Sequence, residues 1–263
     1  MLYRLAISVL LLWALLGLFA PLLPLQPNVM ELESILQPPT ASSWLGYDDL
    51  GRPLMDRLLA GAQTSFRVAL WVVLVSSLLG TLLGTLAAYL GGWLDRLLVQ
   101  VIDIMLAFPG ILLAIALAGM LGPGMDNVVI ALSAVGWVGY ARLSRAQVLS
   151  LKHRDHVLAA RALGSGTPVI LVRHLLPLMS APLIIEATFG VAAVVIAEAG
   201  LSFLGLGVQP PDASWGSMIR DGTRYMLVAP HMVLVPGIAL WLVVMSVNLL
   251  GDRLRDHLDV RSR

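Results

Sequence analysis

Residues 154–177 read RDHVLAARALGSGTPVILVRHLLP, a polar and basic stretch in a chain that is otherwise strongly apolar. The first half has the pattern of a short amphipathic helix, and this pattern breaks at Gly164–Gly166. We expect Gly164 to adopt a backbone conformation that a Cβ would penalise. Thr167 as N-cap and Pro168 at the first helical position indicate a second helix directly after the break. The stretch therefore predicts a helix–break–helix between two membrane spans. Another protein could bind to it from the cytoplasmic side.

The rest of the chain has the composition of a multi-pass membrane protein. Hydrophobic residues make up 58% of the 263 residues and charged residues only 13%, too little charge for the surface of a soluble domain. Apolar runs of about 20 residues cross a bilayer as helices. We predict an all-α membrane protein with six transmembrane helices, the first a retained anchor rather than a signal peptide. The runs lie at about 5–25, 68–91, 98–121, 127–149, 178–200 and 232–251.

Arginine and lysine set the expected orientation. With the N-terminus inside and six spans, cytoplasmic segments hold twelve of the 17 Lys and Arg residues and outer segments hold five. This bias follows the positive-inside rule. Both termini are therefore expected in the cytoplasm. The two long outer segments, about 26–67 and 201–231, are expected to carry small structured elements.

The composition also argues against several kinds of chemistry. A net charge of +1 gives no sign of a nucleic-acid partner, and a chain without cysteine has no disulfide or thiolate metal site. An ATPase needs a phosphate-binding loop with Gly before Lys, whereas the single lysine, Lys152, follows Leu151. His153 and His156 would supply half of a metal site, and we interpret them as solvated helix residues. We predict no catalytic residue, metal site or bound cofactor, and therefore no enzyme.

A strip of small residues runs along the second predicted span. Gly80, Gly84, Ala88 and Gly92 are spaced four apart, which puts them on one face of a helix. Small side chains let helix backbones approach closely in lipid, which gives no hydrophobic drive to association. The spacing predicts a packing face, and a face that slides during transport is the alternative.

Three acidic residues, Asp103, Glu186 and Glu198, lie at or within predicted spans. Such a residue is costly at the bilayer centre, roughly 2.5–3.5 kcal/mol for Asp on insertion scales. It either lines a substrate path or bonds a neighbouring helix as a structural acid. We take all three as candidates for the path, with Glu186 deepest and Glu198 near the outer boundary and partly hydrated.

The third predicted span contains Phe108-Pro109-Gly110. Proline removes a backbone donor and clashes with the preceding turn, so it kinks a helix. The sequence therefore predicts an interruption of this span. Kinks of this kind shape the pathway in many transporters, although proline is also frequent in membrane helices generally.

Val157–Pro177 resembles the cytoplasmic signature of binding-protein-dependent ABC importer permeases. That signature is Glu-Ala-Ala, then Gly, then an apolar run that ends in Leu-Pro. Ala159-Ala160, Gly164 and Leu176-Pro177 match it in order. Leu158 stands where the family has Glu, so a salt bridge from that position is not expected, although docking is.

Three further stretches narrow the resemblance to the dipeptide/oligopeptide/nickel branch. Residues 44–53 are similar to the first outer loop of that branch, with Tyr47 and Pro53 as departures. Residues 201–216 and 248–259 are similar to a later outer motif and to the C-terminal end. The four stretches extend over nearly the whole chain. The resemblance implies a type I ABC importer permease core with six transmembrane helices and a cytoplasmic coupling helix.

The resemblance also implies a set of partners. This chain looks like the second permease of a pair and would form half of a translocation path for dipeptides, oligopeptides, nickel or metallophore complexes. One or two ATP-binding subunits would bind below it and use ATP and Mg²⁺, and an extracytoplasmic solute-binding protein would dock above. The contacts with the ATPase would come from the coupling helix, at Arg154, Val157, Leu158, Ala159, Ala160, Arg161, Leu163 and Gly164.

The expected organisation has three parts: a membrane anchor with an outer loop at 1–61, the transmembrane domain at 62–252 and a cytoplasmic tail at 253–263. A secondary transporter or channel that works without an ATPase is the alternative function. It would use intramembrane acids such as Glu186 and Asp103 as ion sites.

Overall fold

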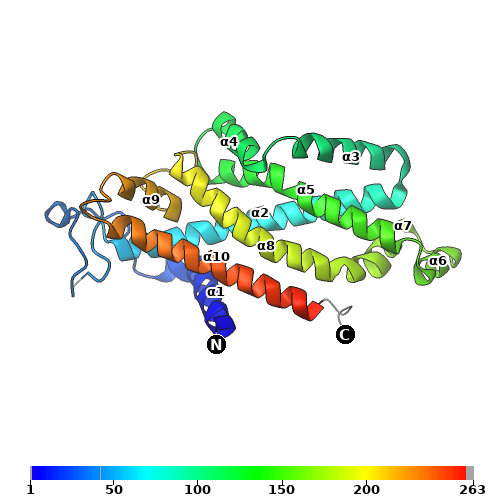
Figure 1. The fold of residues 1–263 in the computed structure, drawn as a ribbon, viewed down its shortest axis with the longest axis horizontal. Coiled ribbons are helices and arrows are strands. Elements are labelled where there is room, and N and C mark those ends of the chain that lie inside the picture. The colour runs from blue at the N-terminus through cyan, green and yellow to red at the C-terminus, as the bar shows by residue number, and fades with distance from the viewer. Residues whose placement is uncertain (1, 42, 259–263) are drawn as a thin grey trace.

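The computed structural model describes residues 2–41 and 43–258, and this part of the chain is almost entirely helical (Figure 1). Five segments are long and apolar enough to cross a membrane. They are α1 (Leu2–Phe19) with the 3-10 turn η1 (Ala20–Leu22), α2 (Leu54–Leu90), α5 (Met125–Leu151), the segment Thr167–Phe203 and α10 (His231–Leu258). Thr167–Phe203 consists of α7 (Thr167–Val169), the π-helical turns η3 (Ile170–Leu175) and α8 (Leu176–Phe203).

A bent pair of helices is the candidate for the sixth span. α3 (Gly92–Leu106) and α4 (Gly110–Leu121) pass the same length and hydropathy test together but meet at an angle of 87°. The break contains Pro109, which has no N–H to donate and precedes the first residue of α4. The predicted interruption of the third span is therefore confirmed, and the bend is close to a right angle.

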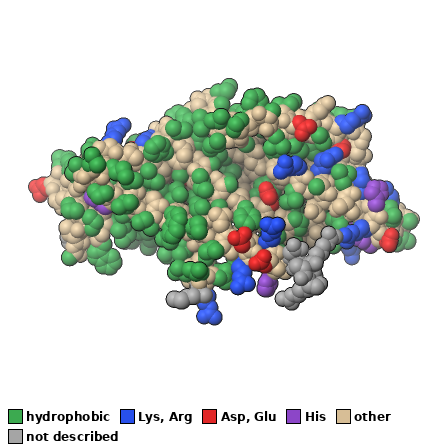
Figure 2. All heavy atoms as spheres, in the orientation of Figure 1, with side chains coloured by type: hydrophobic (Ala, Val, Ile, Leu, Met, Phe, Trp, Pro, Cys, Tyr) green, Lys and Arg blue, Asp and Glu red, His purple; other side chains and the backbone are tan. Residues whose placement is uncertain are grey.

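Short elements fill the two ends of the molecule. α6 (Asp155–Ala162) lies at one end, and α9 (Trp215–Thr223) lies at the other beside the loop that precedes α2 (Figure 1). That loop contains the 3-10 turn η2 (Leu32–Ser34) and one isolated bridge between Tyr47 and Pro53. Apolar side chains cover the middle of the face in Figure 2, and most charged ones lie toward the α6 end and the C-terminal part of α10. This distribution suits a chain whose middle lies in lipid.

The boundaries differ from the sequence prediction at several points. α2 begins at Leu54 instead of about residue 68, so Arg57 and Arg67 belong to the helix. Thr167 is the first residue of α7 and Gly166 occupies the N-cap, contrary to the predicted cap. α2 ends before Gly91 and Gly92, which have φ values of +70° and +66°, because this left-handed conformation does not continue a right-handed helix.

α2 and α5 form the most extensive helix contact of the bundle, and the small residues of α2 make it possible. A Cβ added to Gly80 would collide with the Trp137 carbonyl oxygen, and one added to Gly84 with the Ala141 carbonyl oxygen. Ser144 Oγ donates to the Tyr140 carbonyl oxygen of its own helix at 2.7 Å and lies 3.4 Å from the Gly80 carbonyl oxygen, so it packs closely in this contact. The predicted packing strip is correct for its first three positions, since Ala88 is fully buried, but Gly92 lies outside α2.

α1 is attached to the bundle through Trp13. Trp13 Nε1 donates to the Ala62 carbonyl oxygen at 3.2 Å, and its ring packs edge-on against Phe66 with centroids 5.3 Å apart. Gly17 lies directly against the Phe66 ring, where a larger side chain would not fit. α1 also packs along α10, so the first helix is an integral part of the bundle.

Replacement of Gly84 by valine is expected to destabilise the bundle by about 1–3 kcal/mol, because the new side chain meets backbone atoms of α5 that do not move independently. The midpoint of heat-induced aggregation in detergent measures this loss. Gly119→Val in α4 is the matched control, since a Cβ at Gly119 has open space within 4 Å. Equal midpoints for the two variants would contradict the role of Gly84.

Candidate functional site

α6 is a two-faced helix at one end of the molecule. Val157 is fully buried and Ala160 is 7% exposed, and Val157 belongs to one apolar cluster with Tyr89, Ile170 and Leu175. This apolar cluster joins the ends of α2 and α5 to η3. The inner face of α6 is therefore seated on the membrane helices.

The outer face of α6 presents a mixed apolar and basic surface. Leu158 is 43% exposed and Leu163 is 87% exposed, and Arg154, Ala159 and Arg161 are also exposed. Large apolar side chains that project from a short helix at the end of a bundle favour contact with another protein. Because of Leu158 and Leu163, the exposed surface of α6 is partly apolar, which the arginines alone did not indicate.

Gly164 ends α6 with a conformation that other residues rarely adopt. Its φ is +82°, and a Cβ there would meet no atom within 4 Å. The constraint on this position therefore lies in the backbone and not in crowding. The prediction that Gly164 adopts a backbone conformation penalised by a Cβ is confirmed.

The three acidic residues proposed from the sequence occupy two different environments. Asp103 on α3 and Glu186 on α8 are exposed in the single chain. The Glu186 carboxylate lies against Gly139 of α5, where an added Cβ would come within 3.1 Å of its oxygen. Among the described residues, no donor forms a hydrogen bond with Glu186.

Glu198 is buried, and the expectation of partial hydration near a boundary is wrong. It is 1% exposed and accepts hydrogen bonds from Ser202 Oγ at 2.8 Å and from Ser65 Oγ at 3.0 Å. Ser65 belongs to α2, so the carboxylate joins α2 to α8. The nearby α9 begins in direct backbone contact with α8, where Gly216 lies against the Ala199 carbonyl oxygen. A sequence pattern does not reveal this burial, because Ser65 is 133 residues away.

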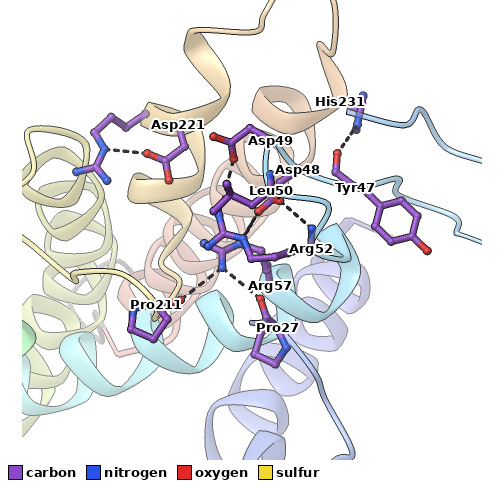
Figure 3. A network of polar contacts seen from close by, with 11 residues as sticks. Pro27, Tyr47, Asp48, Asp49, Leu50, Arg52, Arg57, Pro211, Asp221 and His231 are labelled. Carbon is purple, nitrogen blue, oxygen red and sulfur yellow. Dashed lines mark hydrogen bonds and ion pairs between the residues drawn. The ribbon is translucent and has the colours of Figure 1, made fainter. Parts of the chain in front are cut away.

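A charged network at the α9 end holds the loop before α2 (Figure 3). Asp48 accepts hydrogen bonds from Arg52 Nε at 2.6 Å and from the backbone N–H groups of Leu50 and Arg52 at 2.9 Å each. Arg57 Nε forms an ion pair with the same carboxylate at 3.2 Å. Asp48, Arg52 and Arg57 are 3%, 5% and 3% exposed, so the charges are almost fully removed from solvent.

The network continues to segments far away in the sequence. Arg57 Nη1 donates to the carbonyl oxygens of Pro27 at 3.2 Å and Pro211 at 3.4 Å, and His231 Nε2 lies 3.2 Å from the Tyr47 carbonyl oxygen (Figure 3). The loop before α2, the loop before α9 and the start of α10 are thereby joined. The predicted outer elements are present, but the sequence analysis did not identify Asp48, Arg52 and Arg57 as a group. The Asp–Arg spacing in residues 48–52 was the available signal.

Asp49 differs from its neighbour in this network. Burial, and then the adjacent Asp48 carboxylate, raise the pKa of Asp49 above its ordinary value. Arg52 lies 3.8 Å from Asp49, too far for a hydrogen bond. Asp48 therefore accepts the short hydrogen bonds of the network, and Asp49 is a second acid beside it that is only weakly paired.

A groove of about 700 Å³ runs between α2 and the segment Thr167–Ala187. Its α2 wall carries Ser77, Thr81 and Thr85, one helical turn apart, among apolar side chains. Thr85 Oγ1 is buried without a hydrogen-bond partner. These hydroxyl groups were not identified from the sequence, although their four-residue spacing was visible there.

These features define a class of protein. A bundle of membrane-crossing helices carries an exposed helix between two spans, and the described residues contain no group of three or more metal-binding side chains. Glu198 links α2 to α8, and Asp48 holds the loop before α2. A helical bundle of this kind is typical of the membrane subunit of a transporter.

The comparisons with known proteins identify the family. Residues 80–263 match the family described as "Binding-protein-dependent transport system inner membrane component", and the chain belongs to this family. It is a permease of a binding-protein-dependent ABC importer, in a multi-pass arrangement in the inner membrane.

Two curated relatives and one solved structure extend the match. The glutathione transport system permease protein GsiD of Escherichia coli O6:K15:H31 is 41% identical over 88% of this chain and 77% of its own. The dipeptide transport system permease protein DppC of Alkalihalophilus pseudofirmus is 40% identical over 95% of this chain and 82% of its own. An inward-facing structure of the MetNI methionine ABC transporter matches with a TM-score of 0.64, covering 78% of this chain and 98% of that chain at 18% identity. The solved structure supports the fold alone.

Replacement of Asp48 by alanine is expected to lower the free energy of unfolding by about 3–5 kcal/mol, because Arg57 would keep a buried charge without its carboxylate. Thermal denaturation of the purified chain measures the change. Asp56→Ala is the matched control, since Asp56 only accepts an exposed hydrogen bond from the Gln26 N–H at 2.8 Å. A loss for Asp48→Ala no larger than that of the control would contradict the account of the network.

Proposed function

We propose that this permease imports short peptides, by pairing with a second homologous permease and working with one or two separate ATP-binding subunits. GsiD and DppC are described as glutathione and dipeptide permeases, and both substrates are small peptides. Nickel or metallophore complexes have less support from the relatives. ATP and Mg²⁺ act on the partner ATPase, and an extracytoplasmic solute-binding protein delivers the peptide.

The observation that carries this proposal is the exposed outer face of α6. Leu158, Ala159 and Leu163 form an apolar surface of the kind that inserts into a groove on another protein, with Arg154 at its edge. Val157 and Ala160 hold the helix from below, and Gly164 sets its end. Together with Arg161, these residues form the proposed coupling helix. Its outer face contacts the ATPase, and its inner face contacts the membrane helices.

The proposed orientation follows from the basic residues. The α6 end and both termini lie in the cytoplasm, and the α9 end with the Asp48 network lies outside. The solute-binding protein then meets the loop before α2 and the segment around α9. The division into 1–61, 62–252 and 253–263 is part of the same proposal.

The proposed path includes Glu186 and Asp103. Both are exposed in the single chain, where a carboxylate facing lipid would be costly. A water-filled path between two permeases removes that cost, and Glu186 then offers a negative charge to the amino terminus of a peptide. Glu198, sealed between α2 and α8, serves this path only by holding the two helices together.

Glu186→Gln is expected to lower ATP-driven uptake of a labelled dipeptide by about tenfold in vesicles that contain the complete importer, because the attraction for the peptide ammonium group is lost. Glu198→Gln is the matched control on the same helix and should transport within about twofold of the unchanged chain, since the amide oxygen still accepts a serine hydroxyl. Uptake by Glu186→Gln equal to that of the control would remove Glu186 from the path.

Gly164→Ala is expected to weaken co-purification of the ATP-binding subunit and to reduce uptake severalfold, since the added Cβ penalises the left-handed backbone by roughly 1 kcal/mol or more. Gly166→Ala is the matched control, two residues away with φ of −68° and room for a Cβ. If both variants bind the ATPase like the unchanged chain, the coupling surface does not depend on the conformation of Gly164.

A further inference from the structure

Arg161 of α6 lies over an aromatic ring of its own chain. Its Cζ atom is 5.3 Å from the centroid of the Tyr89 ring, within the range of a cation–π interaction. In the described part of the chain, no carboxylate forms an ion pair with Arg161. Among the described residues, the ring face is therefore the one specific partner of this guanidinium.

Tyr89 is a fixed point at the end of a long helix. It is 9% exposed and is the penultimate residue of α2, directly before the turn at Gly91. Its ring belongs to the same apolar cluster as Val157 of α6. Lys152 adds a polar contact one residue away, because its Nζ donates to the Ala88 carbonyl oxygen at 3.0 Å.

α6 has two routes to the membrane helices, and they differ in the regularity of the backbone. The route to α8 runs through η3, on which α6 packs directly and to which it is joined through Gly164 and Gly166, and the π-helical turns of η3 interrupt the regular helix geometry. The route to α2 is a direct contact with a continuous helix of 37 residues. α2 is in turn held against α5 at Gly80 and Gly84, where backbone meets backbone.

We propose that Arg161 and Tyr89 form the link through which movement of α6 reaches α2. Arg161 is then a positioning residue, because it acts through Tyr89 and touches neither peptide nor nucleotide. When the ATPase displaces α6, the guanidinium pulls or pushes the end of α2, and α5 follows. This inference rests on the proposed function of α6 and specifies which membrane helix the movement of α6 reaches first.

The chemistry of the pair supplies matched variants. Tyr89→Phe keeps the ring face that attracts the cation, whereas Tyr89→Leu keeps an apolar side chain and removes the ring. Arg161→Gln removes the charge. Arg154→Gln is the control for charge alone, since Arg154 lies at the start of the same helix and contacts no ring in the described part of the chain.

The first experiment measures how firmly α6 is held against the membrane helices, in this chain alone. The sequence contains no cysteine, so a cysteine at Leu158 accepts a single nitroxide label. Tyr89→Leu and Arg161→Gln are expected to raise the mobility of the label at 158 in electron paramagnetic resonance spectra, and Tyr89→Phe and Arg154→Gln are expected to leave it unchanged. Equal spectra for Tyr89→Leu and Tyr89→Phe would overturn the link.

The second experiment measures coupling in vesicles that contain the complete importer. Tyr89→Leu is expected to retain ATPase binding but to transport about fivefold less dipeptide per ATP hydrolysed, with Tyr89→Phe within about twofold of the unchanged chain. In the double variant, Arg161→Gln should add little to Tyr89→Leu, because the shared interaction is already lost. Fully additive effects, or an unchanged ratio in Tyr89→Leu, would overturn the proposal.

The two experiments separate this inference from the proposed function. If the unchanged chain binds no ATPase, the proposed function fails, while the label at 158 still reports whether Tyr89 seats α6. If the ATPase binds and drives uptake but label mobility and coupling are insensitive to Tyr89→Leu, only the inferred link fails.

Discussion

The contact between α2 and α5 is the constraint on which the rest of the structure depends. Lipid gives apolar helices no reason to associate, so two helices stay together in it only when their backbones come close enough for dense packing and short polar contacts. Gly80 and Gly84 provide that approach, and Ser144 fills the remaining space. With α2 and α5 fixed, α8 packs against both, and α1 and α10 complete the bundle.

The structures that surround the α2–α5 pair differ between its two ends. At the α6 end, an apolar cluster around Tyr89 and Val157 seats a helix whose other face stays open. At the α9 end, Asp48 and Arg57 are removed from solvent and tie three segments together. One end thus leaves a helix face exposed, and the other keeps loops in a fixed arrangement around the ends of the spans.

Much of the fold was predictable because membrane-spanning helices can be recognised in a single sequence. Length and hydropathy indicated the spans, Pro109 indicated the break, and Gly164 indicated a special backbone conformation. The contacts that decide the site were less accessible. Periodicity describes one helix at a time, so it did not reveal that Ser65 meets Glu198 or that Arg161 turns toward Tyr89. The early start of α2 was hidden by Arg57 and Arg67, whose charges lowered the apparent hydropathy.

The right-angled bend between α3 and α4 limits the surroundings of this subunit. Around Pro109 the regular helical pairing of backbone groups is interrupted, and hydrocarbon offers no replacement partners. Wherever the elbow at residues 107–109 lies at the depth of the hydrocarbon, it therefore needs another protein chain or water beside it. At that depth lipid molecules form only part of the boundary of this permease, and the elbow marks a sector of its circumference from which they are excluded.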